Sequence, residues 1–288
     1  MADKTGISWT SATWNPTTGC DRVSPGCDHC YALTLAKRLK AMGSAKYQND
    51  GDPRTSGPGF GLAVHPDTLD APLHWRAPRR VFVNSMSDLG HARISREFLA
   101  RVWSVMARTP QHTYQILSKR PDRIAAWVRR CSVHDLHAGY PGTPAEPDET
   151  CCNHPGEIIV GYEQWPLPNV HIGTSVELDR YCRRADDLRE TPAALRFLSL
   201  EPLLGPLPSL NLDGIGWVIV GGESGPGHRE MDIAWLESLV AQCQDAGVAI
   251  HVKQDSGPRS GMQGRIPDDI WALKQFPGDV AAVAAGRG

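Results

Sequence analysis

The sequence predicts an α/β protein with a parallel sheet, either open or curled into a barrel. Short runs rich in β-branched and aromatic residues recur along the 288 residues, and helical patterns lie between them. Strand and helix in alternation give right-handed βαβ units, which build a parallel sheet. Polar or charged residues follow directly after the apolar runs. In parallel α/β folds the carboxyl ends of the strands share one edge, so we expect the functional site there.

Six runs are the predicted strands. They are Val81–Ser85, Thr113–Leu117, Val170–Thr174, Leu195–Ser199, Trp217–Gly221 and Val248–Val252. Two helices are well marked: Ser95–Arg108 has an apolar stripe at helical spacing, and Ile233–Ala246 lies between a capping Asp232 and Gly247. Further helices are expected after Cys30, Pro121 and Asp179.

Two long segments interrupt this alternation. Residues 43–80 are rich in Gly and Pro and too long for an ordinary connection, so we expect an excursion over the surface or a lid. Residues 131–168 contain six prolines and no Lys or Arg, and they are interpreted as an inserted acidic loop. We therefore expect a single domain over residues 1–288 that carries two inserted loops.

The composition, with 41% hydrophobic and 22% charged residues, is typical of a soluble globular protein. No run of about 18 uncharged apolar residues is present and the N-terminus is polar, so we expect a cytoplasmic protein without a membrane partner. In that compartment the eight cysteines favour metal binding or redox chemistry over disulfides.

The net charge of -2 conceals an asymmetry. Residues 76–130 carry twelve Lys or Arg against three acids, a local charge of +9, which leaves -11 for the rest of the chain. This distribution favours an anionic partner such as nucleic acid. Solvated helix faces are the alternative interpretation.

Three cysteines near the N-terminus, Cys20, Cys27 and Cys30, are the most specific feature. The last two have the C-x2-C spacing that lets two thiolates reach one metal centre, and Cys20 adds a third ligand. Iron–sulfur clusters normally take four cysteines, so three would leave one iron open to another ligand. A structural zinc site and free thiols are the alternatives.

The polar residues at the strand ends are the candidate rim of the site. They are Asn84, Ser85 and Asp88, then Lys119 and Arg120, then Ser175 and Glu177, and finally Glu201, Glu223 and Lys253. Against a role in binding or catalysis stands the alternative that Lys–Glu pairs at such a rim are structural salt bridges.

A second metal site is considered in the acidic insert. Cysteines and histidines lie toward its two ends: Cys131, His134, His137, Cys151, Cys152 and His154. Such pairs can chelate zinc, whereas incidental loop residues are the alternative. Cys182 and Cys243 fall on helical patterns and are expected in the core.

An ordered set of motifs gives a resemblance to a known family. The motifs are WNPTTGC (residues 14–20), the C-x6-C-x2-C pattern, VFVNSMSD (81–88), QILSKRP (115–121), IGTSVE (172–177), FLSLEPLL (197–204) and WVIVGGESG (217–225). Together they resemble the bacteriophage-associated radical-SAM-like family known as phage protein Gp thirty-seven/sixty-eight, a distant relative of the spore photoproduct lyases. The resemblance covers roughly residues 7–254.

This resemblance implies a partial (βα)6-type barrel with a 4Fe-4S cluster on Cys20, Cys27 and Cys30. S-adenosylmethionine would chelate the open iron, and its reductive cleavage would give a 5′-deoxyadenosyl radical that abstracts hydrogen from a substrate. The chain departs from the superfamily in two places, since the first cysteine gap is six residues instead of three and His29 replaces the usual aromatic residue.

The resemblance also suggests roles for the rim. Asn84, Ser85 and Asp88 would contact the amino group of the methionyl moiety, and Ser175 and Glu177 the ribose. Lys119 and Arg120 would meet the cofactor carboxylate or a substrate phosphate. The candidate catalytic residues on the substrate side are Lys119, Glu201, Glu223 and Lys253.

The function expected from these features is a radical-SAM enzyme that modifies or repairs a nucleic acid or nucleotide. It would need an electron donor such as flavodoxin or ferredoxin, and it would work in the host cytoplasm if it is phage-encoded. The alternative is a non-catalytic module, stabilised by iron–sulfur or zinc, that binds nucleic acid or a partner protein.

Overall fold

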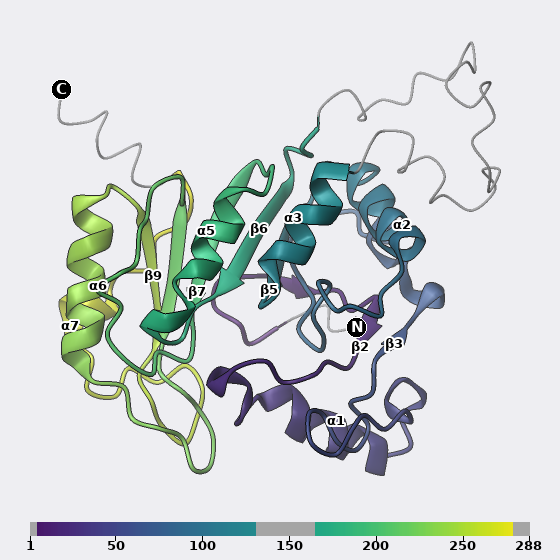
Figure 1. Ribbon diagram of the computed structural model, residues 1–288, viewed down its shortest axis with the longest axis horizontal. Coiled ribbons are helices and arrows are strands. Elements are labelled where there is room, and N and C mark those ends of the chain that lie inside the picture. Colours follow the sequence, from purple (N-terminus) through teal and green to yellow (C-terminus); the bar gives the residue numbers. More distant parts are fainter. Residues whose placement is uncertain (1–4, 131–164, 279–288) are drawn as a thin grey trace.

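The computed structural model describes residues 5–130 and 165–278 (Figure 1). Its seven-stranded parallel sheet curls into a half-barrel with the strand order β1-β4-β5-β6-β7-β8-β9. The strands are β1 (Ala12–Thr13), β4 (Arg80–Val83), β5 (Thr113–Ser118), β6 (Val170–Ser175), β7 (Leu195–Leu200), β8 (Trp217–Gly221) and β9 (Ala249–Gln254). The α/β class, the parallel sheet and its curled form are therefore confirmed.

All six predicted strands are present, within one or two residues at their ends. The seventh, β1, was not predicted because two residues are too short to show a period. It pairs in parallel with β4, with Ala12 opposite Val81. A separate antiparallel pair, β2 (Thr17–Thr18) and β3 (Ala63–Val64), lies at the start of the loop that carries the cysteines.

The helices also follow the sequence signals. They are α1 (Tyr31–Ala41), α2 (Arg96–Ala107), α3 (Pro121–Arg130), α5 (Arg183–Arg189), α6 (Ile233–Asp245) and α7 (Asp268–Trp271). Ser95 caps α2 by accepting from the Phe98 amide, and Asp232 caps α6 through the Ala234 amide. Gly247, with φ +64°, ends α6 in the left-handed conformation expected of it. The prediction did not include α7.

The two faces of the sheet bury different side chains. Val81, Leu198 and Val218 pack with residues of α2, α3 and α6, the helices on the outer face (Figure 1). The alternate residues Phe82 and Trp217 point to the concave face, where they pack with four other buried residues. Those four are Trp9, Phe197, Ile219 and Ala249. Aromatic rings thus fill the concave face below the carboxyl edge.

The first inserted segment contains local structure of its own. It includes η2 (Ala45–Tyr47), β3, η3 (Pro66–Thr68) and η4 (Ala71–His74), and its Phe60 and Leu69 are buried. It packs against α1 and therefore adds to the body around the cysteine loop. Of the predicted acidic insert, residues 131–164 lie outside the described part of the chain.

Among the residues that the structure describes, no helix combines the length and the apolar character that crossing a membrane requires.

Candidate functional site

The three N-terminal cysteines lie on one loop between β2 and α1, which we call the cysteine loop (residues 19–30). Cys27 ends the short helix η1 (Pro25–Cys27), and Cys30 immediately precedes α1. All three are free, partly buried thiols. Cys20 and Cys30 pack against the same buried cluster, which includes Ala32 and Met86, and Cys27 lies between them in the loop.

Two of these thiols have raised pKa values, chiefly because they are buried. Burial raises the pKa of Cys20 to about 12, with a further contribution from Asp88 and an opposing one from Arg120. Burial also raises the pKa of Cys30. Both side chains are therefore protonated thiols at neutral pH when no cation is bound, and a metal that bound them would displace their protons. In the described part of the chain no group of three or more His, Cys, Asp or Glu side chains has the spacing to hold a metal ion.

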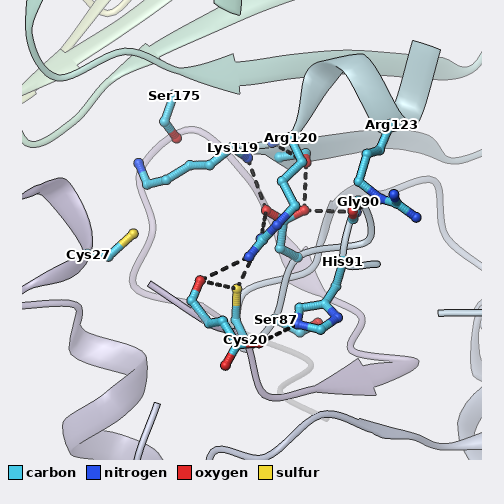
Figure 2. A network of polar contacts seen from close by, with 12 residues as sticks. Cys20, Cys27, Ser87, Gly90, His91, Lys119, Arg120, Arg123 and Ser175 are labelled. Atoms are coloured by element: carbon cyan, nitrogen blue, oxygen red, sulfur yellow. Dashed lines mark hydrogen bonds and ion pairs between the residues drawn. The ribbon is translucent and has the colours of Figure 1, made fainter. Parts of the chain in front are cut away.

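Asp88 and Arg120 hold the first part of the cysteine loop (Figure 2). Arg120 Nη1 lies 2.8 Å from Asp88 Oδ2 and 3.4 Å from Cys20 Sγ. Its Nη2 donates to the Asp21 carbonyl oxygen at 3.0 Å. Arg120, one of the predicted rim residues, therefore contacts the first cysteine directly, and Asp88 holds Arg120 in place.

Asp21 gives the loop a second attachment. One carboxylate oxygen lies 2.9 Å from His91 Nε2, and the other accepts from the Thr55 and Ser56 hydroxyls. These hydrogen bonds lower the pKa of Asp21 although burial opposes them. The inserted segment and the residues after β4 thus both hold the loop beside Cys20.

Glu177, after β6, lies under the middle of the loop. It is fully buried, and a Cβ atom at Gly26 would lie 3.2 Å from its Cδ. Arg184 contacts its carboxylate at 2.9 Å and Lys119 Nζ lies at 3.7 Å. Burial raises the pKa of Glu177, but Lys119, Ser24, Arg184 and the Gly26 amide outweigh it, so the net pKa is lowered.

Glu223, after β8, holds the end of the loop. Its carboxylate pairs with the Arg229 guanidinium and lies 2.9 Å from His29 Nδ1. Arg229 also donates to the Pro25 carbonyl oxygen at 2.9 Å. Burial opposes ionisation, yet these hydrogen bonds lower the pKa of Glu223 to about 2.

The carboxylates that hold the loop come from alternate strands. Asp88, Glu177 and Glu223 follow β4, β6 and β8 and reach the beginning, middle and end of the cysteine loop, respectively. The loop is consequently seated on the carboxyl edge of the sheet, where the sequence predicts the site.

Three further rim residues, Ser175, Glu201 and Lys253, lie at the ends of β6, β7 and β9. Glu201 Oε1 lies 2.9 Å from Lys253 Nζ, and its other oxygen accepts from Ser199. Ser175 is buried, and its carbonyl oxygen accepts from Arg184. Lys253 and Glu201 thus form a Lys–Glu salt bridge at the rim, the structural alternative to a role in binding or catalysis that the sequence left open.

Asn84 and Ser85 lie at the end of β4. Asn84 donates to Thr17 Oγ1 at 2.8 Å, whereas its buried Oδ1 has no hydrogen-bond partner. Ser85 exchanges hydrogen bonds with Asn15, and its carbonyl oxygen accepts from the Tyr31 hydroxyl at 2.5 Å. Among the rim residues, Asn84 Oδ1 and Glu177 Oε1 are therefore buried acceptors without a hydrogen-bond partner.

Sequence reasoning missed several residues of the site. His29 and Tyr31 flank Cys30, so their positions in the motif were a signal that could have found them. His91, Arg184 and Arg229 gave no comparable signal, because their partners are set by the packing of neighbouring strand ends.

A cavity of about 400 Å³ opens between α2 and α3 beside this network. Gly90, His91 and Arg123 line it together with Arg96 and Trp127. The cavity and the cysteine site share the wall formed by Gly90 and His91. A ligand bound in the cavity would therefore contact residues that hold Asp88 and Asp21.

The remaining cysteines fall into two groups, those expected in the core and those in the acidic insert. Cys182 and Cys243 are buried, as expected of core residues. The insert candidates Cys131, His134, His137, Cys151, Cys152 and His154 lie outside the described residues, and zinc binding by that loop stays a prediction.

A protein-family model matches residues 4–267, and the family is described as a protein of unknown function, DUF5131. No curated protein and no solved structure matches the chain. All of the site residues between Cys20 and Lys253 lie within the matched range.

Proposed function

Since the chain belongs to the DUF5131 family, whose function is unknown, we propose a function from the site itself: an iron–sulfur protein of the radical-SAM type. The observation that carries this proposal is the seating of three partly buried thiols on the carboxyl edge of a curled parallel sheet. Sites of parallel α/β folds are built at that edge.

The chemistry of the three donors supports a 4Fe-4S cluster as the group that they would hold. Cys20, Cys27 and Cys30 supply soft thiolate ligands, and Cys182 and Cys243 belong to the core between sheet and helices. Arg120 offers a cation beside the sulfur of Cys20. With three protein ligands, one iron would be open to S-adenosylmethionine, and the cluster would supply the electron for its reductive cleavage.

The chain's own residues would bind and orient this cofactor. The unpartnered Asn84 Oδ1 is an acceptor for an ammonium or hydroxyl group at the mouth. Lys253 and Glu201 would face the substrate from the far strands. The resemblance suggests cofactor contacts for Asp88, Arg120 and Glu177. Arg120 and Glu177 contact the cysteine loop, and Asp88 holds Arg120 in place, which favours a role in positioning the loop.

We propose a nucleic acid or nucleotide as the substrate class, which the basic segment at residues 76–130 supports. The contacts that hold the cysteine loop are also compatible with a non-catalytic module that is stabilised by a metal. Calorimetric titration with S-adenosylmethionine separates the two functions, because the enzyme must bind it and the module has no need to.

The direct test is anaerobic reconstitution with iron and sulfide. We expect about four irons per chain, a broad visible absorption band, and 5′-deoxyadenosine after addition of dithionite and S-adenosylmethionine. Cys27→Ala should lose the cluster and this product, because two thiols remain.

Cys182→Ala is the matched control, since it removes a buried core thiol and should keep the iron content. A wild-type protein that binds zinc and no iron contradicts the proposal. A loaded cluster that never yields 5′-deoxyadenosine contradicts its enzymatic part.

A further inference from the structure

The side chain of Arg120 contacts the sulfur of one of the three cysteines, Cys20. We infer that Arg120, locked by Asp88, is a positioning residue that donates a hydrogen bond to the Cys20 sulfur and thereby raises the reduction potential of the cluster. This inference rests on the proposed function.

Arg120 contacts both the side chain of Cys20 and the backbone of the residue after it. Arg120 places one nitrogen 3.4 Å from Cys20 Sγ and another 3.0 Å from the Asp21 carbonyl oxygen. It therefore holds the sulfur and the backbone that follows it. The Arg120 side chain is 13% exposed, so little water competes for these contacts.

Asp88 fixes the guanidinium in this position. Its Oδ1 accepts from the Ser118 hydroxyl at 2.6 Å and from the Gly90 amide at 2.8 Å. Its Oδ2 accepts from Arg120 and from the Lys119 amide at 3.1 Å. With both oxygens engaged and its side chain 8% exposed, Asp88 is a fixed anchor for Arg120.

The neighbouring cations are directed elsewhere, as Figure 2 shows. Lys119 extends toward Ser175 and lies 3.7 Å from Glu177 Oε2. Arg123 points away from Cys20 and donates to the Gly90 carbonyl oxygen at 2.9 Å. Cys27 has a hydroxyl neighbour, Ser24 Oγ, at 3.8 Å. The arrangement thus makes Cys20 differ from Cys27 by a charged donor.

A charged N–H donor stabilises electron density on sulfur. Reduction adds an electron to the cluster, so the donor favours the reduced form and raises the potential. Asp88 carries the opposite charge but lies behind the guanidinium, which is the group in contact with the sulfur. Loss of Arg120 should therefore lower the potential.

The test is a redox titration of the reconstituted protein, followed by electron paramagnetic resonance. Arg120→Gln should shift the oxidised-to-reduced ratio at a fixed potential at least tenfold, equivalent to 59 mV for one electron. Arg120→Lys keeps the charge but loses the fork that reaches sulfur and Asp88 together, so a smaller shift of the same sign is expected.

A double variant, Arg120→Gln with Asp88→Asn, guards against misfolding because it leaves no buried unpaired carboxylate. It should shift in the same direction. Arg123→Gln is the matched control and should keep the wild-type potential.

The outcomes are distinguishable. A protein without iron overturns the proposed function together with this inference. A fully loaded cluster with the same potential in wild type, Arg120→Gln and the double variant overturns the inference alone. An equal shift in Arg123→Gln also overturns it, since the effect would then be one of general charge.

Discussion

Two buried titratable residues, Glu223 and His251, lie in contrasting environments. Glu223 is buried beside Arg229 and His29, which keep it ionised, whereas the buried His251 on β9 lies against the rings of Trp217 and Phe276. Burial, together with Lys274, Lys253 and Arg80, lowers the pKa of His251 to about 4. Its Nε2 contacts the Ser8 hydroxyl at 2.9 Å, and its Nδ1 has no partner. The folded protein therefore holds this histidine neutral.

His251 gives a prediction for the pH dependence of stability. Between its unfolded pKa of about 6.5 and its folded pKa of about 4, the unfolded chain binds the additional proton, so stability falls as the pH is lowered. His251→Gln should reduce the slope of unfolding free energy against pH in this window by about 1.4 kcal/mol per pH unit. Urea denaturation at several pH values measures it.

His74→Gln is the control for this prediction, because His74 is exposed and its replacement should leave the slope unchanged. An unaltered slope in His251→Gln would show that another group dominates the acid response.

On the concave face, an aromatic side chain of one strand fills the space beside a glycine of the neighbouring strand. Gly173 of β6 pairs directly with Phe197 of β7, and the fully buried ring of Phe197 occupies the space beside the glycine. A Cβ atom at Gly173 would lie 2.5 Å from that ring. The absence of a side chain on one strand therefore makes room for an aromatic residue on the next.

Gly173→Ala should destabilise the protein by about 1–3 kcal/mol, since the Phe197 ring has to move within a packed layer. The urea midpoint should fall while the m-value is unchanged. Gly257→Ala, at a position with open space within 4 Å, is the control and should cost less than about 0.5 kcal/mol. A wild-type midpoint in Gly173→Ala would refute the packing argument.

For the molecule as a whole, part of the basic segment is used internally. Arg120 contacts Cys20, Arg123 contacts the Gly90 carbonyl oxygen, and Arg80 lies 4.1 Å from the centre of the Phe276 ring. Arg93 is 63% exposed, and its guanidinium also lies 3.7 Å from Asp21 Oδ2. The charge of +9 therefore overstates the number of cations that a phosphate backbone can reach.

The proposed anionic partner can be tested by filter binding to single-stranded DNA and RNA over a salt series. Affinity should fall linearly with the logarithm of the salt concentration. Arg93→Gln should weaken binding and reduce the slope by about 1, whereas Arg54→Gln, an exposed cation outside the segment, should not. Equal slopes in both variants would contradict nucleic-acid contact through this segment.

The sequence by itself determined the order of strands and helices along the chain and the edge of the sheet at which the candidate site lies. Residue periodicity, helix caps and strand-end polarity are local signals, and they located β4 to β9, α2 and α6 correctly. The spacing of Cys20, Cys27 and Cys30 is likewise short-range, so the sequence is sufficient to locate the cysteine loop.

The tertiary structure decided which side chains meet. Asp88 and Arg120 were predicted as separate contacts of a cofactor, but the curled sheet brings them together beside Cys20. Arg184 and Arg229, which the sequence did not single out, pair with Glu177 and Glu223. A buried charge needs a partner, and strand packing determines which oppositely charged group is within reach. Local sequence patterns do not encode the distance between such groups.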